Sequence, residues 1–527
     1  MTTETYAVHS ANCAANRSLY QPHFLVHALS TDLDRRVLTF GDTSLSADEF
    51  RQMVSRYSQA LAEMGLQPGD RVAVLSANRP EVLYLTAACL INRYVLVPMH
   101  PLGSLEDHVF VLADAGATHL VFDPKRFAQR AEQVAHECSG IRLLSFGASA
   151  VGVDLTSASA RMRPAPLAAP DVSGDDVYRY SYTGGTTGRP KAIAATHSMA
   201  LALLNAQLAD WEWPGQLRQL MCAPLSHAGA AMFMPTLLRG GELVVLPQFD
   251  PVTVMKTIES QRITCVLLVP TMIYALLDHP RFRDFDLSSL QTVFYGASAM
   301  SPVRLREAIE ALGPIFFQFY GQAEAPMTIS VLRRGEHIAN DYRRLSSCGR
   351  PVHGVHVALL NDDGDEVHPG ELGEICARGP LVMAGYHNRP EETRDALRGG
   401  WLHTGDIATC DPDGFLRIVD RKKDLIISGG FNVYPKEIED VLTMHPAVAT
   451  SAVIGVRDAR WGEAVKAIVV LRNGESASTE ELIAFVRERK GSHHAPKSVA
   501  FVDDLPLTAV GKPDKRTLRA QFSAGPP

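Results

Sequence analysis

The chain has 527 residues, of which 46% are apolar and 21% are charged. This length exceeds that of one compact core and predicts two to four domains, and the composition is ordinary for a globular protein. Lysine and arginine (51) are outnumbered by aspartate and glutamate (58), so the formal charge is −7 and no basic block stands out. These features exclude nucleic acid as an expected partner.

Targeting signals and cysteine spacing indicate the expected cellular context. Residues 1–16 lack the charged-then-apolar pattern of a secretion signal, and no run of about eighteen uncharged apolar residues occurs. The eight cysteines form no CxxC pair, which favours reduced thiols over a disulfide or zinc framework. We therefore expect a cytoplasmic protein without a transmembrane segment.

The first part of the chain predicts regular alternation of helix and strand. Ser46 and Glu49 form a capping box that opens an amphipathic helix, and Gly65 ends it. The following residues predict strands over 71–75, 94–99 and 119–122 and helices over 80–92 and 105–115. This order favours a mainly parallel sheet with helices on both faces.

The middle of the chain continues this pattern and then changes. Residues 145–173 are rich in Ala, Ser and Pro and are interpreted as a surface connection. Further strands are predicted near 217–222, 243–246, 265–269 and 292–295. From Val355, short strands separated by turns at 361–364, 371–373 and 411–414 indicate an antiparallel sheet or a small distorted β-barrel.

The last part predicts a separate compact α+β unit of about 100 residues, large enough for its own core. Its predicted elements are helices over 436–444 and 479–490 and strands over 450–456, 465–471 and 498–501. The expected fold class is therefore α/β: a large N-terminal domain of βα-type sheets plus a small barrel, followed by a small α+β C-terminal domain.

One loop has the composition of a phosphate cradle, Thr183-Gly184-Gly185-Thr186-Thr187-Gly188-Arg189-Pro190-Lys191. Its glycines permit positive φ, so N–H groups and hydroxyls can converge on one point while Lys191 supplies charge. An ordinary flexible surface loop is the alternative. A Walker loop does not match, because Lys191 follows Pro190 and precedes Ala192; Gly511-Lys512 fails likewise, being followed by Pro513.

This loop resembles the phosphate loop of the adenylate-forming enzymes, the superfamily of acyl-CoA synthetases, peptide-synthetase adenylation domains and luciferases. Taken singly, each further match has a structural explanation, since buried histidines and acids in turns are common. Six more matches occur in the family's order: Pro224-Leu225-Ser226-His227, Phe294-Tyr295-Gly296-Ala297-Ser298, Tyr320-Gly321-Gln322-Ala323-Glu324, Trp401-Leu402-His403-Thr404-Gly405-Asp406, the stretch from Asp420 to Glu439, and Pro506-Leu507-Thr508-Ala509-Val510-Gly511-Lys512.

The resemblance implies an ATP-dependent acid–CoA ligase that uses ATP, Mg²⁺ and coenzyme A. A carboxylate is a poor electrophile, so its oxygen first attacks the α-phosphate of ATP, giving acyl-AMP and pyrophosphate. The thiol of CoA then displaces AMP. Charge develops on phosphoryl oxygens in the first step, so catalysis depends on positioning and charge neutralisation.

By resemblance, particular residues take particular roles in the first step. The catalytic residues are Lys512, which bridges the substrate carboxylate and the α-phosphate, with His227 and Glu324. Mg²⁺, which prefers oxygen ligands, is assigned to Thr183 and Glu324. Binding of ATP and AMP is assigned to Thr183, Gly184, Gly185, Thr186, Thr187, Gly188, Lys191, Gly296, Ala297, Ser298, Tyr320, Gly321, Gln322, Ala323, Asp406 and Arg421, with Asp406 on the ribose hydroxyls.

The second step is implied to need rotation of the small domain. The resemblance places a hinge at 420–424 with its pivot at Lys423, between an N-terminal domain (1–419, with a barrel subdomain at about 350–419) and a mobile C-terminal domain (425–527). Gly429, Gly430 and Asn432 are assigned to CoA, because glycine permits close approach of its thin pantetheine arm.

The residues assigned to the acyl pocket are small except for one histidine: His227, Ala228, Gly229, Gly296, Ala297 and Ala323. They predict a roomy apolar cavity for a fatty, aryl or bulky cyclic acid. Three places depart from the family pattern: Gly184 where serine is frequent, Ala323 where threonine is usual, and His493-His494-Ala495-Pro496-Lys497, which lacks the aromatic-lysine pair often found before the proline. A lost hydrogen bond to a charged group costs about 1.5–3 kcal/mol, which affects the rate more than the reaction.

Three alternatives share these motifs. The acyl group could pass to the phosphopantetheine of an acyl-carrier protein, the fold could serve as a non-catalytic acyl or nucleotide sensor, or the enzyme could be a luciferase-like oxygenase. No acidic residue stands where amino-acid-activating relatives place one, which argues against the peptide-synthetase interpretation. A homodimer is left open.

Overall fold

The computed structural model describes residues 18–183, 190–428, 431–458, 461–508 and 512–523. The predicted loop residues Gly184, Gly185, Thr186, Thr187 and Gly188 and the predicted tunnel residues Gly429 and Gly430 lie outside these ranges. Within the described ranges, every helix is too short or too polar to cross a membrane.

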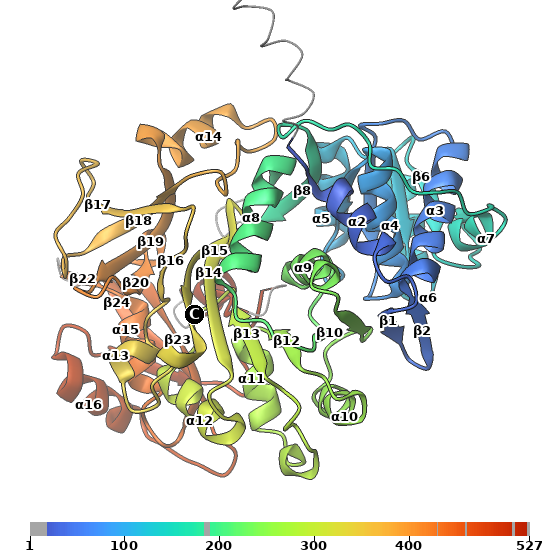
Figure 1. Cartoon of the computed structure of the whole chain (residues 1–527). Coiled ribbons are helices and arrows are strands. Elements are labelled where there is room, and N and C mark those ends of the chain that lie inside the picture. Colours follow the sequence, from blue (N-terminus) through green and yellow to red (C-terminus); the bar gives the residue numbers. More distant parts are fainter. Residues whose placement is uncertain (1–17, 184–189, 429–430, 459–460, 509–511, 524–527) are drawn as a thin grey trace, which may run out of the picture.

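A nine-stranded sheet forms the centre of the molecule (Figure 1). Its inner strands pair in parallel and its edge pairs are antiparallel. In spatial order it contains β16 (Arg350–Pro351), β15 (Ala325–Leu332), β14 (Phe316–Gln322), β13 (Thr292–Gly296), β12 (Cys265–Leu268), β10 (Arg218–Met221), β11 (Glu242–Val245), β1 (Arg36–Phe40) and β2 (Thr43–Ser46).

A second, seven-stranded sheet is built from the first part of the chain. All of its pairs are parallel except the last, in which β8 and β9 form an antiparallel hairpin around the phosphate loop. Its order is β7 (Val153–Asp154), β6 (Arg142–Ser145), β5 (His119–Phe122), β3 (Arg71–Leu75), β4 (Val95–Pro98), β8 (Val177–Thr183) and β9 (Lys191–Thr196).

Helices cover both large sheets through separate apolar cores. One core packs α5 (Leu105–Ala115) and α6 (Pro124–Glu137) on the seven-stranded sheet. Another packs α10 (Pro251–Gln261), α11 (Pro270–Leu277) and α12 (Pro302–Leu312) on the nine-stranded sheet. The largest core lies between the sheets and includes α2 (Gln21–Ser30), α3 (Ala47–Glu63), α4 (Pro80–Asn92), α7 (Leu155–Ala160), α8 (His197–Asp210) and α9 (Phe233–Leu238).

A four-stranded antiparallel sheet occupies the place where a barrel or antiparallel sheet was expected. Its order is β17 (His356–Leu360), β18 (Gly373–Arg378), β19 (Leu402–Cys410) and β20 (Leu416–Arg421). Helix α13 (Tyr342–Leu345) precedes it, and α14 (Pro390–Ala396) lies between β18 and β19. The short 3₁₀ helix η5 (Lys422–Asp424) follows directly on β20, so the chain leaves this sheet at the predicted hinge.

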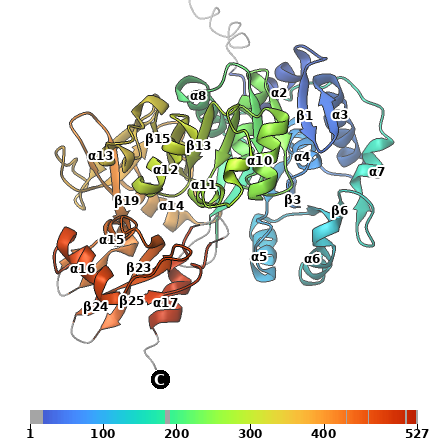
Figure 2. The same cartoon turned by 90° about the horizontal axis from the view of Figure 1, so that it is seen from below.

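The last elements form a group at one end of the molecule (Figure 2). Their sheet contains β22 (Phe431–Val433), β21 (Ile426–Ser428), β24 (Gly462–Leu471), β23 (Val448–Asp458) and β25 (Ser498–Phe501). Helices α15 (Pro435–Leu442) and α16 (Thr479–Lys490) share one core with it, and α17 (Lys515–Ser523) shares another. This group therefore has cores of its own.

The predicted fold class is confirmed, and several local predictions agree in detail. The Ser46 hydroxyl accepts the Glu49 N–H, and the Glu49 carboxylate accepts the Ser46 N–H in return. Residues 145–173 are only partly a surface connection, because they contain β7 and α7. Leu155 and Ala158 of α7 are buried in the largest core, and a segment of two short elements is too brief to give a periodic signal.

Candidate active site

The base of the phosphate loop is a hairpin that fixes two predicted residues opposite each other. Thr183 ends β8, Lys191 begins β9, and the two residues pair in the ladder. The ammonium of Lys191 lies 5.1 Å from the centre of the Tyr386 ring, within the range of a cation–π contact. Backbone pairing of Ile193 with Tyr386 holds that ring beside the hairpin.

The same tyrosine contacts the predicted metal-binding glutamate. The Tyr386 hydroxyl donates a 2.7 Å hydrogen bond to Oε1 of Glu324, and the Glu324 carbonyl accepts the Met383 N–H at 2.8 Å. Burial, followed by the Glu324 charge, raises the pKa of Tyr386 above its ordinary value, so the hydroxyl keeps its proton. Tyr386 therefore joins Lys191 and Glu324 into one site.

Asp406 is the centre of a second group of predicted residues. Its Oδ2 accepts a 2.7 Å hydrogen bond from the Tyr320 hydroxyl, and its Oδ1 lies 2.9 Å from Nε of Arg421. Asp406 of β19 and Arg421 of β20 are ladder partners, and Tyr320 comes from β14 of the nine-stranded sheet. The Asp406 side chain is 4% exposed, so its contacts with Tyr320 and Arg421 are largely shielded from water.

The segments assigned to adenine run close to neighbouring backbone. A Cβ on Gly296 would lie 2.3 Å from the Phe319 carbonyl oxygen, and one on Gly321 would lie 2.6 Å from the Met327 nitrogen. Ala297 has φ +66°, a conformation that side chains rarely adopt and that often marks functional turns. Tyr320 lies near the end of β14, so the ends of β13 and β14 and the start of β15 converge here.

Lys512 reaches this region from the last segment of the chain. It is half-buried, and Thr508 holds its loop through a 3.2 Å bond from the Lys512 N–H to the threonine hydroxyl. Removal from water, helped by the cations of Arg421 and Lys423 and opposed by the carboxylates of Asp406 and Glu324, lowers the pKa of Lys512 to about 8. Lys512 is therefore within electrostatic range of both groups described above.

His227 lies in an environment that keeps its ring neutral. Its Nδ1 contacts the Ser226 hydroxyl at 2.9 Å, and its ring centre lies 4.6 Å from that of His100. Burial, His100 and the guanidinium of Arg179 together lower the pKa of His227 to about 3. Next to it, a Cβ on Gly229 would lie 2.5 Å from the Ala223 carbonyl oxygen, so glycine is needed for the close packing of this loop.

The remaining predicted residues lie at the ends of these elements or outside the groups described above. Ala228 begins the 3₁₀ helix η1 (Ala228–Met232), Gln322 ends β14, and Ala323 lies in the turn before β15. Ser298 follows β13. Lys423 is part of η5, and Asn432 is an exposed residue of β22.

Sequence reasoning missed three polar residues of this region. Tyr386 lies in an irregular stretch, and Glu374 lies inside a β-strand. Arg179 belongs to the apolar-aromatic run before the phosphate loop, and its guanidinium donates a 2.8 Å hydrogen bond to the Ser226 carbonyl. Only Arg179 carried a signal, as a charge in an otherwise apolar run. The contacts of the other two residues join distant segments, which local patterns do not encode.

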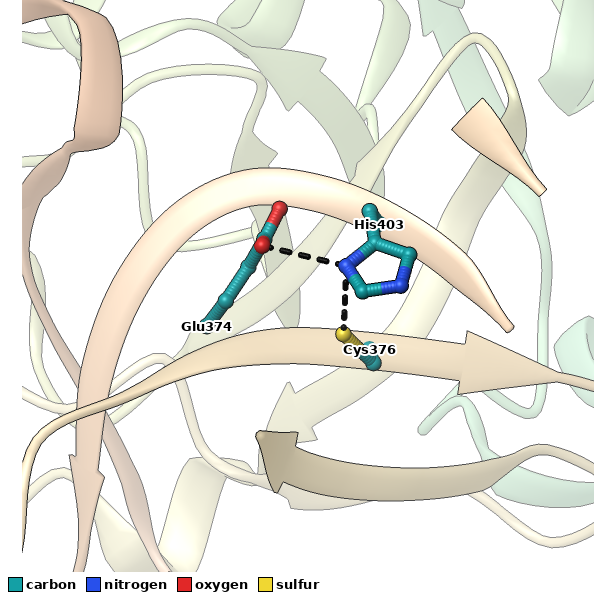
Figure 3. A group of neighbouring side chains, drawn as sticks. All are labelled: Glu374, Cys376 and His403. Atoms are coloured by element: carbon teal, nitrogen blue, oxygen red, sulfur yellow. Dashed lines mark hydrogen bonds and ion pairs between the residues drawn. The ribbon is translucent and has the colours of Figure 1, made fainter. Parts of the chain in front are cut away.

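A separate group, Glu374, Cys376 and His403, lies on β18 and β19 with its ligand atoms within 4.8 Å of one another (Figure 3). Such a donor set suits zinc in principle. The Glu374 carboxylate, however, already contacts Arg398 at 3.1 Å and Lys422 at 3.7 Å. Two neighbouring cations disfavour a further positive ion, so we interpret the group as a hydrogen-bonded cluster.

Two large α/β sheets, an antiparallel sheet and a terminal unit that brings a lysine to a buried aspartate define an adenylate-forming enzyme. Residues 25–387 match the family model of the AMP-binding enzymes, and residues 437–512 match the AMP-binding enzyme C-terminal domain. The chain belongs to the AMP-binding enzyme family, which confirms the resemblance drawn from the motifs.

Similar proteins include ligases for two kinds of acid. The chain is 50% identical to the medium/long-chain-fatty-acid–CoA ligase FadD8 of Mycobacterium tuberculosis, over 95% of this chain and 90% of the relative. It is 41% identical to a feruloyl-CoA synthase of Amycolatopsis sp, over 92% and 95%. The crystal structure of ATP-bound MatB from Rhodopseudomonas palustris superimposes with a TM-score of 0.86 at 28% identity, covering 96% and 99%.

Proposed function

We propose that this protein is an AMP-forming acid–CoA ligase for a fatty, aryl or bulky cyclic carboxylic acid. The observation that carries the proposal is the position of Lys512. This residue comes from the last segment of the chain, yet its ammonium interacts electrostatically with the carboxylates of Asp406 and Glu324 in the larger part. An ammonium at this place suits a reaction in which two anions, a carboxylate and a phosphate, must approach each other.

In the first step, the bond between a substrate carboxylate oxygen and the α-phosphorus forms as the bond from that phosphorus to pyrophosphate breaks. Lys512 neutralises charge on both reactants. Asp406, held by Tyr320 and Arg421, accepts hydrogen bonds from the ribose hydroxyls. The backbone at Gly296 and Gly321 is packed too closely for larger side chains, and we assign the adenine base to this region.

A magnesium ion fits the donors at the phosphate end of the site. Glu324 offers a carboxylate, and Thr183 offers a hydroxyl whose nearest hydrogen-bond contact is 3.5 Å. Both are hard oxygen donors, which Mg²⁺ prefers. When bound, the ion would neutralise charge on the phosphates, while Tyr386 orients Glu324 toward it and Lys191 adds a second positive charge.

In the second step, the CoA thiol attacks the acyl carbon, AMP departs with the former carboxylate oxygen, and the thiol proton passes to solvent. For this we propose that the unit over 425–527 turns about a hinge at 420–424, with Lys423 as the pivot, against the part over 1–419. Lys512 would then leave the site, and Gly429, Gly430 and Asn432 would line the path of pantetheine.

The acid should be largely apolar. His227 stays neutral at physiological pH because the pKa of its ring is about 3, and Ala228, Gly229, Gly296, Ala297 and Ala323 add only small groups. A pocket wall of uncharged and mostly small side chains favours a long alkyl chain or an aromatic ring over a short polar acid. The relatives that act on fatty acids and on ferulate fit the same expectation.

The proposal is tested by mixing the full chain with ATP, Mg²⁺ and one of acetate, octanoate, palmitate or ferulate, and by measuring pyrophosphate and AMP with and without CoA. We expect CoA-dependent turnover with at least one of the three larger acids and little with acetate. Failure of all four acids to support ATP–pyrophosphate exchange would favour the non-catalytic sensor.

The acceptor is tested in the same assay. Replacing CoA with a panel of carrier proteins bearing phosphopantetheine distinguishes a CoA ligase from a carrier-loading ligase, since both share the first step. Faster thioester formation on a carrier than on CoA would reverse our assignment. A cytoplasmic location and a homodimer remain expectations, which fractionation and light scattering can check.

A further inference from the structure

The Glu374 carboxylate lies beside the turn that carries Asp406. It belongs to β18, and the residue is 5% exposed. Its Oε1 accepts the N–H of Gly405 at 2.9 Å, and its Oε2 accepts from Arg398 at 3.1 Å. The same Oε2 accepts from Nδ1 of His403 at 3.1 Å (Figure 3). Both oxygens are therefore occupied by donors from residues 398–405.

These contacts replace missing backbone pairing. In the ladder, Glu374 faces Ile407 and Cys376 faces His403, so the single residue Ile375 of β18 lies opposite residues 404–406 of β19. A strand that bulges in this way leaves backbone groups without ladder partners. The Thr404 hydroxyl donates to the Ile375 carbonyl at 2.7 Å and accepts the Asp406 N–H at 3.1 Å, and Glu374 takes the Gly405 N–H.

The bulge decides where the Asp406 side chain points. Gly405 has φ +73°, a conformation that favours glycine and bends the strand locally. The next residue, Asp406, then meets Tyr320 on one side and Arg421 on the other. Because Glu374 holds the peptide immediately before Asp406, a change at Glu374 would move that carboxylate without removing any group that touches the nucleotide.

The carboxylate also touches the chain just after Arg421. Lys422 has its ammonium 3.7 Å from Oε2 of Glu374 and 2.5 Å from Oδ1 of Asp362. Burial opposes ionisation of Glu374, but hydrogen bonds from His403 and Gly405 outweigh it and lower the pKa of this carboxyl. Glu374 is therefore anionic at neutral pH and contacts both the turn and the start of η5.

We propose that Glu374 is a positioning residue for nucleotide binding, which fixes the 404–406 turn so that Asp406 faces the ribose. This inference rests on the proposed function, because it takes Asp406 as the ribose-binding residue. Zinc binding is the competing use of the cluster. It would require loss of the Cys376 proton, but burial, reinforced by the Glu374 charge, raises the pKa of that thiol to about 12.

The test compares full-length Glu374→Ala, Glu374→Gln and Cys376→Ala with the unmodified protein. Titration calorimetry with AMP and with 2′,3′-dideoxy-AMP measures affinity and stoichiometry, and pyrophosphate exchange gives the KM for ATP and kcat. Glu374→Ala should weaken AMP binding about tenfold, the effect of losing a charge-assisted hydrogen bond near the site. The KM for ATP should rise by the same factor, with kcat within about twofold.

The ratio of the two affinities separates positioning from general loss of structure. Misfolding lowers the stoichiometry but leaves the preference for AMP over the dideoxy compound unchanged, whereas a displaced Asp406 brings that ratio toward one. Glu374→Gln, which keeps an oxygen for the Gly405 N–H, should fall between the unmodified protein and Glu374→Ala. Cys376→Ala, which leaves the Gly405 contact intact, should bind AMP like the unmodified protein.

Each outcome decides a separate question. The positioning role is overturned if Glu374→Ala keeps the same ratio of AMP affinity to dideoxy-AMP affinity as the unmodified protein, or if only its stoichiometry changes. Equal losses in Cys376→Ala and Glu374→Ala also overturn it and support the zinc interpretation. If the unmodified protein neither binds AMP nor catalyses exchange with any of the acids named above, the proposed function fails; if it does both, only the role of Glu374 is being judged.

Discussion

At the scale of single residues, the surroundings of Lys512 lower the pKa of its ammonium group. Removal from water and the cations of Arg421 and Lys423 together lower the pKa of Lys512 to about 8. Its folded-state pKa lies below the usual lysine value of about 10.4, so the ammonium is fully present at low pH and is lost as the pH rises through 8. The first half-reaction should therefore depend on pH within an accessible range.

We predict that kcat/KM for ATP in pyrophosphate exchange will be flat near pH 7 and will fall above pH 8, because this parameter reports the free enzyme. Lys512→Arg, which keeps its charge at all these pH values, should lose the decline even if its rate is lower. A decline that persists unchanged in Lys512→Arg would assign the titration to another group.

Removal of the same side chain gives a second prediction. Lys512→Ala should lower adenylate formation by at least about a hundredfold, in the range found when an electrostatic stabiliser is removed. Conversion of a supplied acyl-adenylate to the thioester should be largely kept, because in the rotation proposed above the lysine leaves the site before that step. Equal losses in both half-reactions, measured by single turnover, would show that Lys512 is structural.

Tyr386 shows how one side chain can link two charged residues. Tyr386→Phe removes the hydroxyl that orients Glu324 but keeps the ring beside Lys191. We predict a rise in KM for MgATP of about tenfold to 150-fold, the effect of one hydrogen bond to a charged group. Tyr342→Phe is the control, because the ring of Tyr342 packs on Arg306 on the outside of α12. Equal KM values in the two variants would exclude this role for Tyr386.

At the scale of elements, the 3₁₀ helix η5 connects the antiparallel sheet to the terminal unit. Asp424 of η5 binds Arg519 of α17 at 2.8 Å, and Lys422 binds Asp362 beyond β17. The two ends of this short helix are thus attached to different sides of the proposed hinge. Any rotation must change backbone angles between these contacts.

We predict that Lys423→Pro will spare the first half-reaction and block the second. A 3₁₀ helix has φ near the value that proline imposes, so the conformation described above tolerates the ring while rotation away from it does not. Lys423→Ala, which keeps backbone freedom, is the matched control. Single-turnover assays of each half-reaction provide the measurement, and unaffected thioester formation in the proline variant would move the pivot elsewhere.

At the scale of the whole molecule, the described residues include few polar contacts between the terminal unit and the large part. Arg472 of the terminal unit lies 3.1 Å from Glu307 of α12, and the hydroxyls of Ser301 and Thr443 are 3.2 Å apart. Glu307 is itself bound to the buried Arg304 at 2.5 Å. A small, polar and partly exposed contact suits the rotation that we propose for this unit.

We predict that Arg472→Ala will shift the balance away from this arrangement and lower the rate of adenylate formation by up to about fivefold, since partly exposed ion pairs contribute about 0.2–1 kcal/mol. Arg489→Ala serves as the control, because Arg489 contacts Glu488 and Phe485 within its own helix α16. The measurement is single-turnover pyrophosphate release. Equal rates in the two variants would show that the ion pair between Arg472 and Glu307 does not contribute to docking of the terminal unit.

The sequence by itself determined the class of fold and the order of the motifs, because helix caps, turns and apolar periodicity are local. Ser46 and Glu49 capped a helix as predicted, and strand 71–75 and helix 105–115 have the predicted bounds. The family motifs named Asp406, Arg421 and Lys512 before their neighbours were known.

Only the tertiary structure decided which side chains meet. Tyr386 joins Glu324 and Lys191, and Glu374 supports the turn before Asp406, although neither stands out in its own segment. Likewise, the pKa of Lys512 follows from burial and from charges that lie about 90 to 190 residues away in the chain. Such contacts depend on sheet register and on how the terminal unit docks, which local sequence patterns do not specify.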